Sequence, residues 1–170
     1  MPFQEPRLAG VFCFRDAKDL IMPKAKLRHV ALGGRPDDVE HSFYEALHKG
    51  DLAQLMNCWA EEEEIVCVHP GGPRLIGSGA IRSAFEALFA RGPVLAHPEQ
   101  VHKIESLASA VHHLVERIDI HTPAGPQKAW VVVTNVFHKT PQGWRMVAHH
   151  ASPGTASDIA AAVSAPAVLH

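Results

Sequence analysis

The first clear pattern of apolar positions begins after Pro36, and its period is helical. Val39, Phe43 and Leu47 recur three to four residues apart, so they fall on one face of a helix. Pro36 suits the first turn of a helix, and the two aspartates that follow it suit the positive end of the helix dipole. Gly50 is a typical stop. The pattern predicts an amphipathic helix between Pro36 and Gly50.

Two further helices and a short strand follow. Residues 52–59 repeat the helical spacing of apolar side chains, and residues 78–91 do so again, with Ser78 at the position of an N-cap. Between these helices, residues 65–69 form a strand-sized apolar run, and residues 70–73 (Pro-Gly-Gly-Pro) must form a loop.

After Pro93 the period changes from helical to strand-like. Proline- and glycine-containing turns separate four candidate strands, which are Val94–Leu107, Val111–His121, Gln127–His138 and Trp144–His150. Helices followed by a run of antiparallel strands indicate the α+β class. We expect three helices on one face of a curved, mainly antiparallel sheet, with a pocket between the two layers.

The pattern also divides the chain. Residues 1–35 contain several prolines and no apolar period, so we interpret them as a weakly structured N-terminal extension that contributes little to the core. Residues 36–153 carry all the regular patterns and are expected to form one domain. Residues 154–170 are an alanine-rich C-terminal tail.

Composition excludes several classes of protein. A net charge of −2 over 170 residues lacks the basic excess that nucleic-acid binding needs. The longest apolar runs are strand-sized, so no membrane span is expected, and the N-terminus lacks the apolar stretch of a signal peptide. Three cysteines without a CxxC pair argue against a secreted disulfide framework. We expect a cytoplasmic protein.

Several short motifs, in the right order, give the chain a resemblance to a known superfamily. They are Phe43-Tyr44-Glu45-Ala46-Leu47, Gly50-Asp51-Leu52, Trp59-Ala60, His69-Pro70-Gly71-Gly72, Gly77-Ser78-Gly79-Ala80-Ile81 and the stretch from Gly143 to Pro153. Over residues 37–153 the chain resembles the SnoaL-like, ketosteroid isomerase-like superfamily, which also contains nuclear transport factor 2. The resemblance implies a cone-shaped α+β domain, but this fold carries many unrelated functions.

The chain departs from the isomerases of that superfamily at two positions. Aligning the first helix on its motif places Phe43 where those enzymes have a tyrosine that donates to an oxyanion. Aligning on the proline after the first strand places His69 where they have the aspartate base. Steroid isomerisation by a tyrosine and an aspartate is therefore not expected.

Two histidines are the candidate catalytic residues. His69 ends a strand before the Pro-Gly loop, where an imidazole can face a pocket and act as a base near neutral pH. On the last strand, Met146, Ala148 and His150 share one face, while Arg145 and His149 share the other. We favour His150 for the pocket because its face is the more apolar one. Alternatively, both histidines are structural, His69 as the anchor of its loop.

Five residues are candidates for ligand binding. Phe43, Trp59 and Phe85 would make an apolar pocket that suits a small hydrophobic or aromatic molecule, and Trp130 or Asn135 on the third strand could join it. The same side chains at these spacings are also typical of core packing.

No metal or cofactor is expected. Each pair of adjacent histidines, at 112–113 and 149–150, is split across the two faces of its strand, and neither HxH nor HExxH occurs. Apolar residues on both faces of residues 130–137 favour a homodimer formed through the outer face of the sheet. The leading hypothesis is a small-molecule-binding protein with an apolar pocket, which could act as an acid–base isomerase, cyclase or lyase that uses histidine. The alternative is a non-catalytic ligand-binding or dimerisation module.

Overall fold

The computed structural model describes residues 34–155, 157–158 and 160. Most of the expected N-terminal extension and most of the C-terminal tail lie outside these residues. The described elements are α1 (Pro36–Lys49), α2 (Leu52–Asn57), β1 (Val66–Val68), β2 (Arg74–Ile76), α3 (Ser78–Phe89), β3 (Leu95–Glu105), β4 (Ser109–Thr122), β5 (Gly125–Thr140) and β6 (Gly143–Pro153). None of the described helices is both long enough and apolar enough to cross a membrane.

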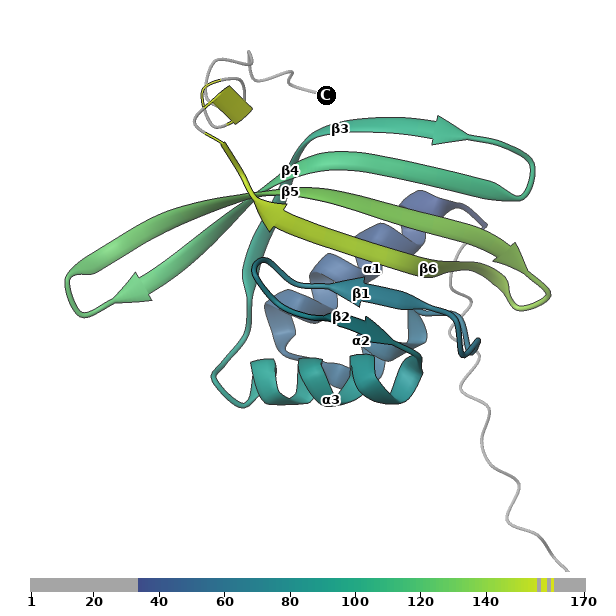
Figure 1. Cartoon of the computed structure of the whole chain (residues 1–170), viewed down its shortest axis with the longest axis horizontal. Helices are drawn as coiled ribbons and strands as arrows, with labels where there is room; N and C mark the ends of the chain where they lie inside the picture. The colour runs from purple at the N-terminus through teal and green to yellow at the C-terminus, as the bar shows by residue number, and fades with distance from the viewer. Residues whose placement is uncertain (1–33, 156, 159, 161–170) are drawn as a thin grey trace, which may run out of the picture.

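The strands form one six-stranded sheet in the order β2-β1-β6-β5-β4-β3. Every neighbouring pair is antiparallel except β1 and β6, which run parallel. The three helices gather on one side of this twisted sheet (Figure 1). The predicted α+β class, with three helices on a mainly antiparallel sheet, is confirmed. Strand β2 was not expected, because its three residues are too short to show a period.

The helices form where the apolar spacing predicts them. Helix α1 buries Val39, Phe43 and Leu47 against the sheet, and Gly50 ends it in the left-handed conformation with φ of +64°. The side chain of Asp51 then accepts a hydrogen bond from the backbone of Gln54 at 2.9 Å and so caps α2. The tight Gly50–Asp51 junction folds α2 back beside α1, which leaves α1 free to cover the sheet.

Strand β6 contains a β-bulge that the period-two pattern did not predict. Phe137 of β5 pairs with Met146, but the preceding residue, Val136, pairs with Ala148. Val147 is therefore an extra residue on β6. A bulge of this kind shifts the alternation of side chains by one position, so Met146 and His149 face the helices although they are three residues apart.

Candidate functional site

A cavity of about 670 Å³ lies between the helical layer and the inner face of the sheet. Its walls come from α1, α3, the loop after β1, and strands β3, β4 and β6. Most of the wall is apolar, and the polar exceptions at its inner end are His69, Glu116 and His149. The volume lies within the range of about 300–1,000 Å³ typical of small-molecule sites.

His69 is positioned by the turn that follows β1. Pro70 and Gly71 occupy the two central positions, Gly71 has a φ of +70°, and the Gly72 amide donates to the His69 carbonyl at 2.9 Å. Proline followed by a glycine with positive φ is the pattern of a type II turn. The ring of His69 lies edge-on to Phe85, with centroids 4.9 Å apart. Burial lowers the pKa of His69, which favours the neutral imidazole.

His149, and not His150, lines the cavity. The expectation that His150 faces the pocket is wrong, because the bulge at Val147 reverses the alternation after Met146 and leaves His150 exposed on the outer face. His149 is 6% exposed. Burial, with a further contribution from His69, lowers the pKa of His149 to about 3, so this imidazole is neutral at physiological pH.

A chain of buried hydrogen bonds fixes the orientation of His149. Glu40 Oε1 accepts from Asn135 Nδ2 at 3.0 Å, so the amide oxygen of Asn135 faces the other way, toward His149 Nδ1 at 2.8 Å. An amide oxygen only accepts, so Nδ1 of His149 carries the proton and Nε2 keeps its lone pair. The second carboxylate oxygen of Glu40 contacts His112 Nδ1 at 2.9 Å.

Glu116 supplies the third polar group of the wall. It is 5% exposed and lies on β4, where Tyr44 Oη donates to its Oε1 at 2.5 Å. Burial raises the pKa of Glu116 to about 7, and the nearby Glu40 acts in the same direction, while the hydrogen bond from Tyr44 acts against it. A carboxyl with a pKa near neutrality exchanges its proton at physiological pH.

The ligand-binding candidates fall into three groups. Phe43 and Phe85 lie in the cavity wall. Trp59 is 2% exposed in the core and Asn135 lies behind His149, so both support the site without lining the cavity. Trp130 does not belong to the site. It lies on the outer face of β5, because its position in the strand alternates with the positions of the buried residues that face inward.

Sequence reasoning missed Glu116 and Glu40. Glu116 shares its strand parity with Leu114 and Ile118, and an acid on an otherwise apolar strand face is a signal that was available. Glu40 lies one residue after Val39 on α1, so the helical pattern places it at the edge of the buried face. Its partners, His112 and Asn135, lie 72 and 95 residues away along the chain.

Comparisons with known proteins agree with the fold. The sequence profile of the SnoaL-like domain matches residues 38–156. A solved structure described as a putative calcium/calmodulin-dependent protein kinase type II association domain, from Thiobacillus denitrificans, is 30% identical, with a TM-score of 0.64, and the match covers 71% of this chain and 95% of that one. A putative dehydratase from the nuclear transport factor 2-like family, from Streptomyces avermitilis, is 29% identical, with a TM-score of 0.63 and coverage of 69% and 93%.

A nuclear transport factor 2-like protein with a cystatin-like fold, from Novosphingobium aromaticivorans, is 18% identical; the match covers 72% of this chain and 83% of that one, with a TM-score of 0.59. At that identity the likeness concerns the fold alone. The comparison with curated proteins found no match. Together, the solved structures confirm the expected nuclear transport factor 2-like fold.

Proposed function

The chain belongs to the SnoaL-like domain family, and from that premise we propose that it is an acid–base enzyme acting on a small, mainly apolar molecule held in the cavity. One observation carries the proposal. Glu116, with a pKa of about 7, shares an apolar cavity with two imidazoles whose pKa values are lowered. Titratable groups with shifted pKa values in a cleft are typical of catalytic sites.

The three groups have different parts in this proposal. Glu116 accepts a proton in its ionised form and returns it in its protonated form, because both forms are populated near pH 7. His149 keeps its proton on Nδ1 and offers Nε2 as a hydrogen-bond acceptor to the bound molecule. His69, whose buried Nε2 has no hydrogen-bond partner among the described residues, is the second polar contact. His150 has no part, since it lies outside the cavity.

Proton removal and return within a mainly apolar pocket suit an isomerase, a cyclase or a lyase. The relative from Streptomyces avermitilis is described as a putative dehydratase, and a dehydratase is a lyase that needs a base for a C–H proton and an acid for the departing hydroxyl. This likeness supports the lyase branch of the proposal. A cytoplasmic location stays a prediction from the cysteine count.

A ligand screen by thermal shift tests the proposal and requires no identified substrate. We expect small apolar carbonyl or hydroxy compounds to raise the melting temperature, because a ligand at 100 times its Kd adds about 2.7 kcal/mol to the free energy of unfolding. His69→Asn should weaken the binding of the same compound by about tenfold, which is the effect of losing one hydrogen bond. His138→Asn, at an exposed histidine of β5, should leave the shift unchanged.

A screen in which no compound at millimolar concentration shifts the melting temperature would contradict small-molecule binding. If hits appear but His69→Asn binds them as the wild type does, His69 has no contact with the ligand.

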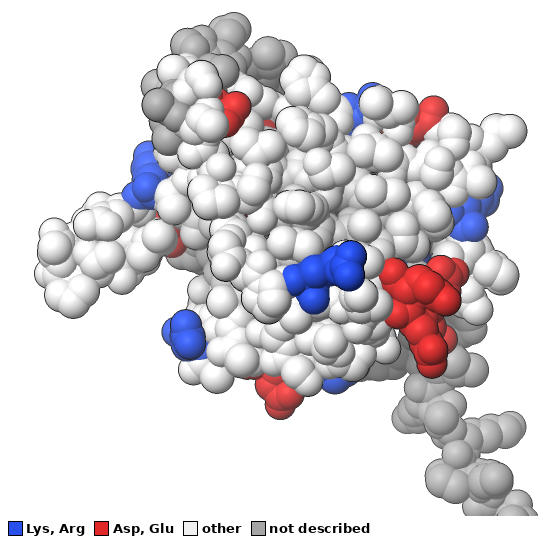
Figure 2. All heavy atoms as spheres, viewed as in Figure 1, with Lys and Arg blue, Asp and Glu red and all other residues white. Residues whose placement is uncertain are grey.

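The second candidate function is association of the chain with itself, without catalysis. The outer face of β5 presents Val132, Thr134 and Val136, which are half-buried in a single chain. Figure 2 shows that few charged side chains lie over strands β4 to β6 in this view. The Thiobacillus denitrificans relative is described as an association domain. These observations support a homodimer through the outer face of the sheet.

Sedimentation at micromolar concentration is expected to give a dimer, and Val132→Lys to give a monomer, because a lysine buried in the interface loses its hydration without a partner. Leu107→Lys is the matched control: Leu107 is 95% exposed between β3 and β4, so the dimer should persist. A monomeric wild-type protein would end this candidate.

A further inference from the structure

His112 has a ring nitrogen that the fold does not use. The side chain is 0% exposed, and its Nδ1 is bound to Glu40 at 2.9 Å. Among the described residues, Nε2 is buried and makes no hydrogen bond. An unsatisfied buried polar atom costs about 1–3 kcal/mol, so this nitrogen needs a physical explanation.

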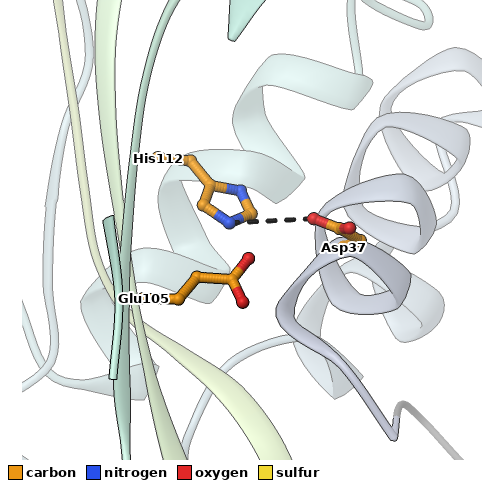
Figure 3. Close-up of side chains that lie close together, drawn as sticks. All are labelled: Asp37, Glu105 and His112. Atoms are coloured by element: carbon orange, nitrogen blue, oxygen red, sulfur yellow. Dashed lines mark ion pairs between the residues drawn. The ribbon is translucent and has the colours of Figure 1, made fainter. Parts of the chain in front are cut away.

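Two carboxylates lie around the same nitrogen. Asp37 Oδ1, from the first turn of α1, is 3.8 Å from Nε2, and Glu105 reaches in from the end of β3 (Figure 3). The strand register explains why Glu105 lies near His112. Glu105 pairs with Ala110, which is two residues before His112 on the adjoining strand and therefore on the same face. One ligand atom from each of the three residues lies within 4.8 Å of the other two. The Nε2 atom that makes no hydrogen bond therefore points into an acidic cluster.

We propose that Asp37, Glu105 and His112 bind one divalent transition-metal ion, of which Zn²⁺ is the type. A mixed imidazole and carboxylate set is the ligand chemistry of Zn²⁺ and its neighbours, whereas Mg²⁺ and Ca²⁺ prefer oxygen ligands alone. Bonds of about 2.0–2.2 Å place tetrahedral ligands roughly 3.4 Å apart. The ligand atoms now lie within 4.8 Å of one another, so they must come closer to reach this spacing. The exposed Glu105 and the half-buried Asp37 can move inward, while His112 is already held by Glu40.

Glu40 completes the arrangement behind the proposed ligands. A metal-binding histidine usually donates its other N–H to a carboxylate, which fixes the ring and increases its basicity. Glu40 accepts such a hydrogen bond from His112 Nδ1, and its other carboxylate oxygen accepts one from Asn135. The same carboxylate thus connects the proposed ion to His149 in the cavity, through Asn135.

Lys103 is a competitor for this position. Its Nζ lies 2.6 Å from Asp37 Oδ1 and donates a hydrogen bond to it. The ammonium group has to leave before a cation binds, and the side chain is 39% exposed, so it can turn toward solvent. Removing Lys103 weakens a cluster that is only an ion pair, whereas it strengthens the binding of a cation by a cluster that is a metal site.

The absence of a metal, expected from the sequence, rested on the division of His112 and His113 between two strand faces. That division is real, because His112 is buried and His113 is exposed. A single imidazole is enough here, since the fold brings two carboxylates to it from distant parts of the chain.

Calorimetric titration of the chelator-treated full chain with Zn²⁺ tests the proposal. We expect one tight site, and binding at least about tenfold weaker in Asp37→Asn and in Glu105→Gln. Lys103→Ala should bind more tightly than the wild type. Glu62→Gln, at an exposed acid outside the cluster, is the control and should match the wild type. Mg²⁺ should bind far more weakly than Zn²⁺.

Glu105 is exposed, so Glu105→Gln is expected to fold normally and keeps the test decisive if Asp37→Asn does not. No Zn²⁺ binding by the wild type would overturn the proposal. So would Zn²⁺ binding that is equal in the wild type and Glu105→Gln, because the ion would then occupy other histidines. Equal affinity for Mg²⁺ and Zn²⁺ would overturn the assigned metal class.

Discussion

At pH 8, Glu116→Gln is expected to raise the free energy of unfolding by about 3 kcal/mol, although it removes a polar group of the site. Burial raises the pKa of Glu116 from 4.5 to about 7, and each unit is worth about 1.4 kcal/mol. Glutamine is neutral, has nearly the same shape and can still accept from Tyr44. It therefore removes the cost of a buried charge while it keeps the hydrogen bond.

The sign of the pH dependence follows from proton binding. Below pH 4.5 the carboxyl is protonated in both the folded and the unfolded chain, so glutamine gives no advantage. Between pH 4.5 and 7 the unfolded chain releases the proton that the folded chain retains, and the wild type loses stability as the pH rises. Denaturant unfolding at pH 4 and at pH 8 measures the difference. Glu62→Gln, at an exposed acid, should change stability by about 0.5 kcal/mol or less at both values.

The same variant should lose turnover by about 10²–10⁴-fold once a substrate is found, because glutamine cannot accept a proton. In the wild type, activity should rise with pH through about 7, since the base must be ionised. Stability that does not improve at pH 8 would show that the carboxyl ionises freely. Undiminished turnover in Glu116→Gln would remove Glu116 from the proposed chemistry.

Asn135→Ala is expected to lower the free energy of unfolding by roughly 2–6 kcal/mol. The amide joins Glu40 to His149 at 3.0 and 2.8 Å, and its loss leaves two buried polar groups without that partner, at about 1–3 kcal/mol each. His149 also loses the acceptor that holds its proton on Nδ1. Unfolding in urea measures the stability, and nitrogen chemical shifts of the imidazole report the tautomer.

Gln127→Ala is the matched control, because Gln127 is an exposed amide on the same strand, β5. It should change stability by about 0.5 kcal/mol and leave the His149 tautomer as it is. An Asn135→Ala protein as stable as this control would contradict the orienting role of the amide.

Elements with a long regular period were predictable from the sequence. Helix α1 shows its buried stripe from Val39 to Leu47, and Gly50 ends it where expected. The four long strands lie within a few residues of their predicted limits. Strand β2 was missed because Arg74–Ile76 is held by its pairing to β1 and not by any pattern of its own.

The site was only partly predictable, and for physical reasons. The Pro-Gly turn correctly indicated that His69 follows a strand at a sharp turn. The prediction that His150, and not His149, faces the pocket was wrong. A period of two assumes an unbroken ladder of strand pairing, and the bulge interrupts that ladder. The link from Glu40 to Asn135 joins residues 95 positions apart, a contact that no local period contains.

The extra residue in β6 decides how this strand should be aligned with its relatives. Removing Val147 would leave Phe137 opposite Met146, Val136 opposite Ala148 and Asn135 opposite His149. A homologue one residue shorter here keeps the same inner imidazole beside the same amide. An ungapped alignment from Trp144 would instead match His149 to the outward-facing residue of the shorter homologue and transfer its role to a surface side chain. Equivalent histidines in this strand are identified by their cross-strand partner.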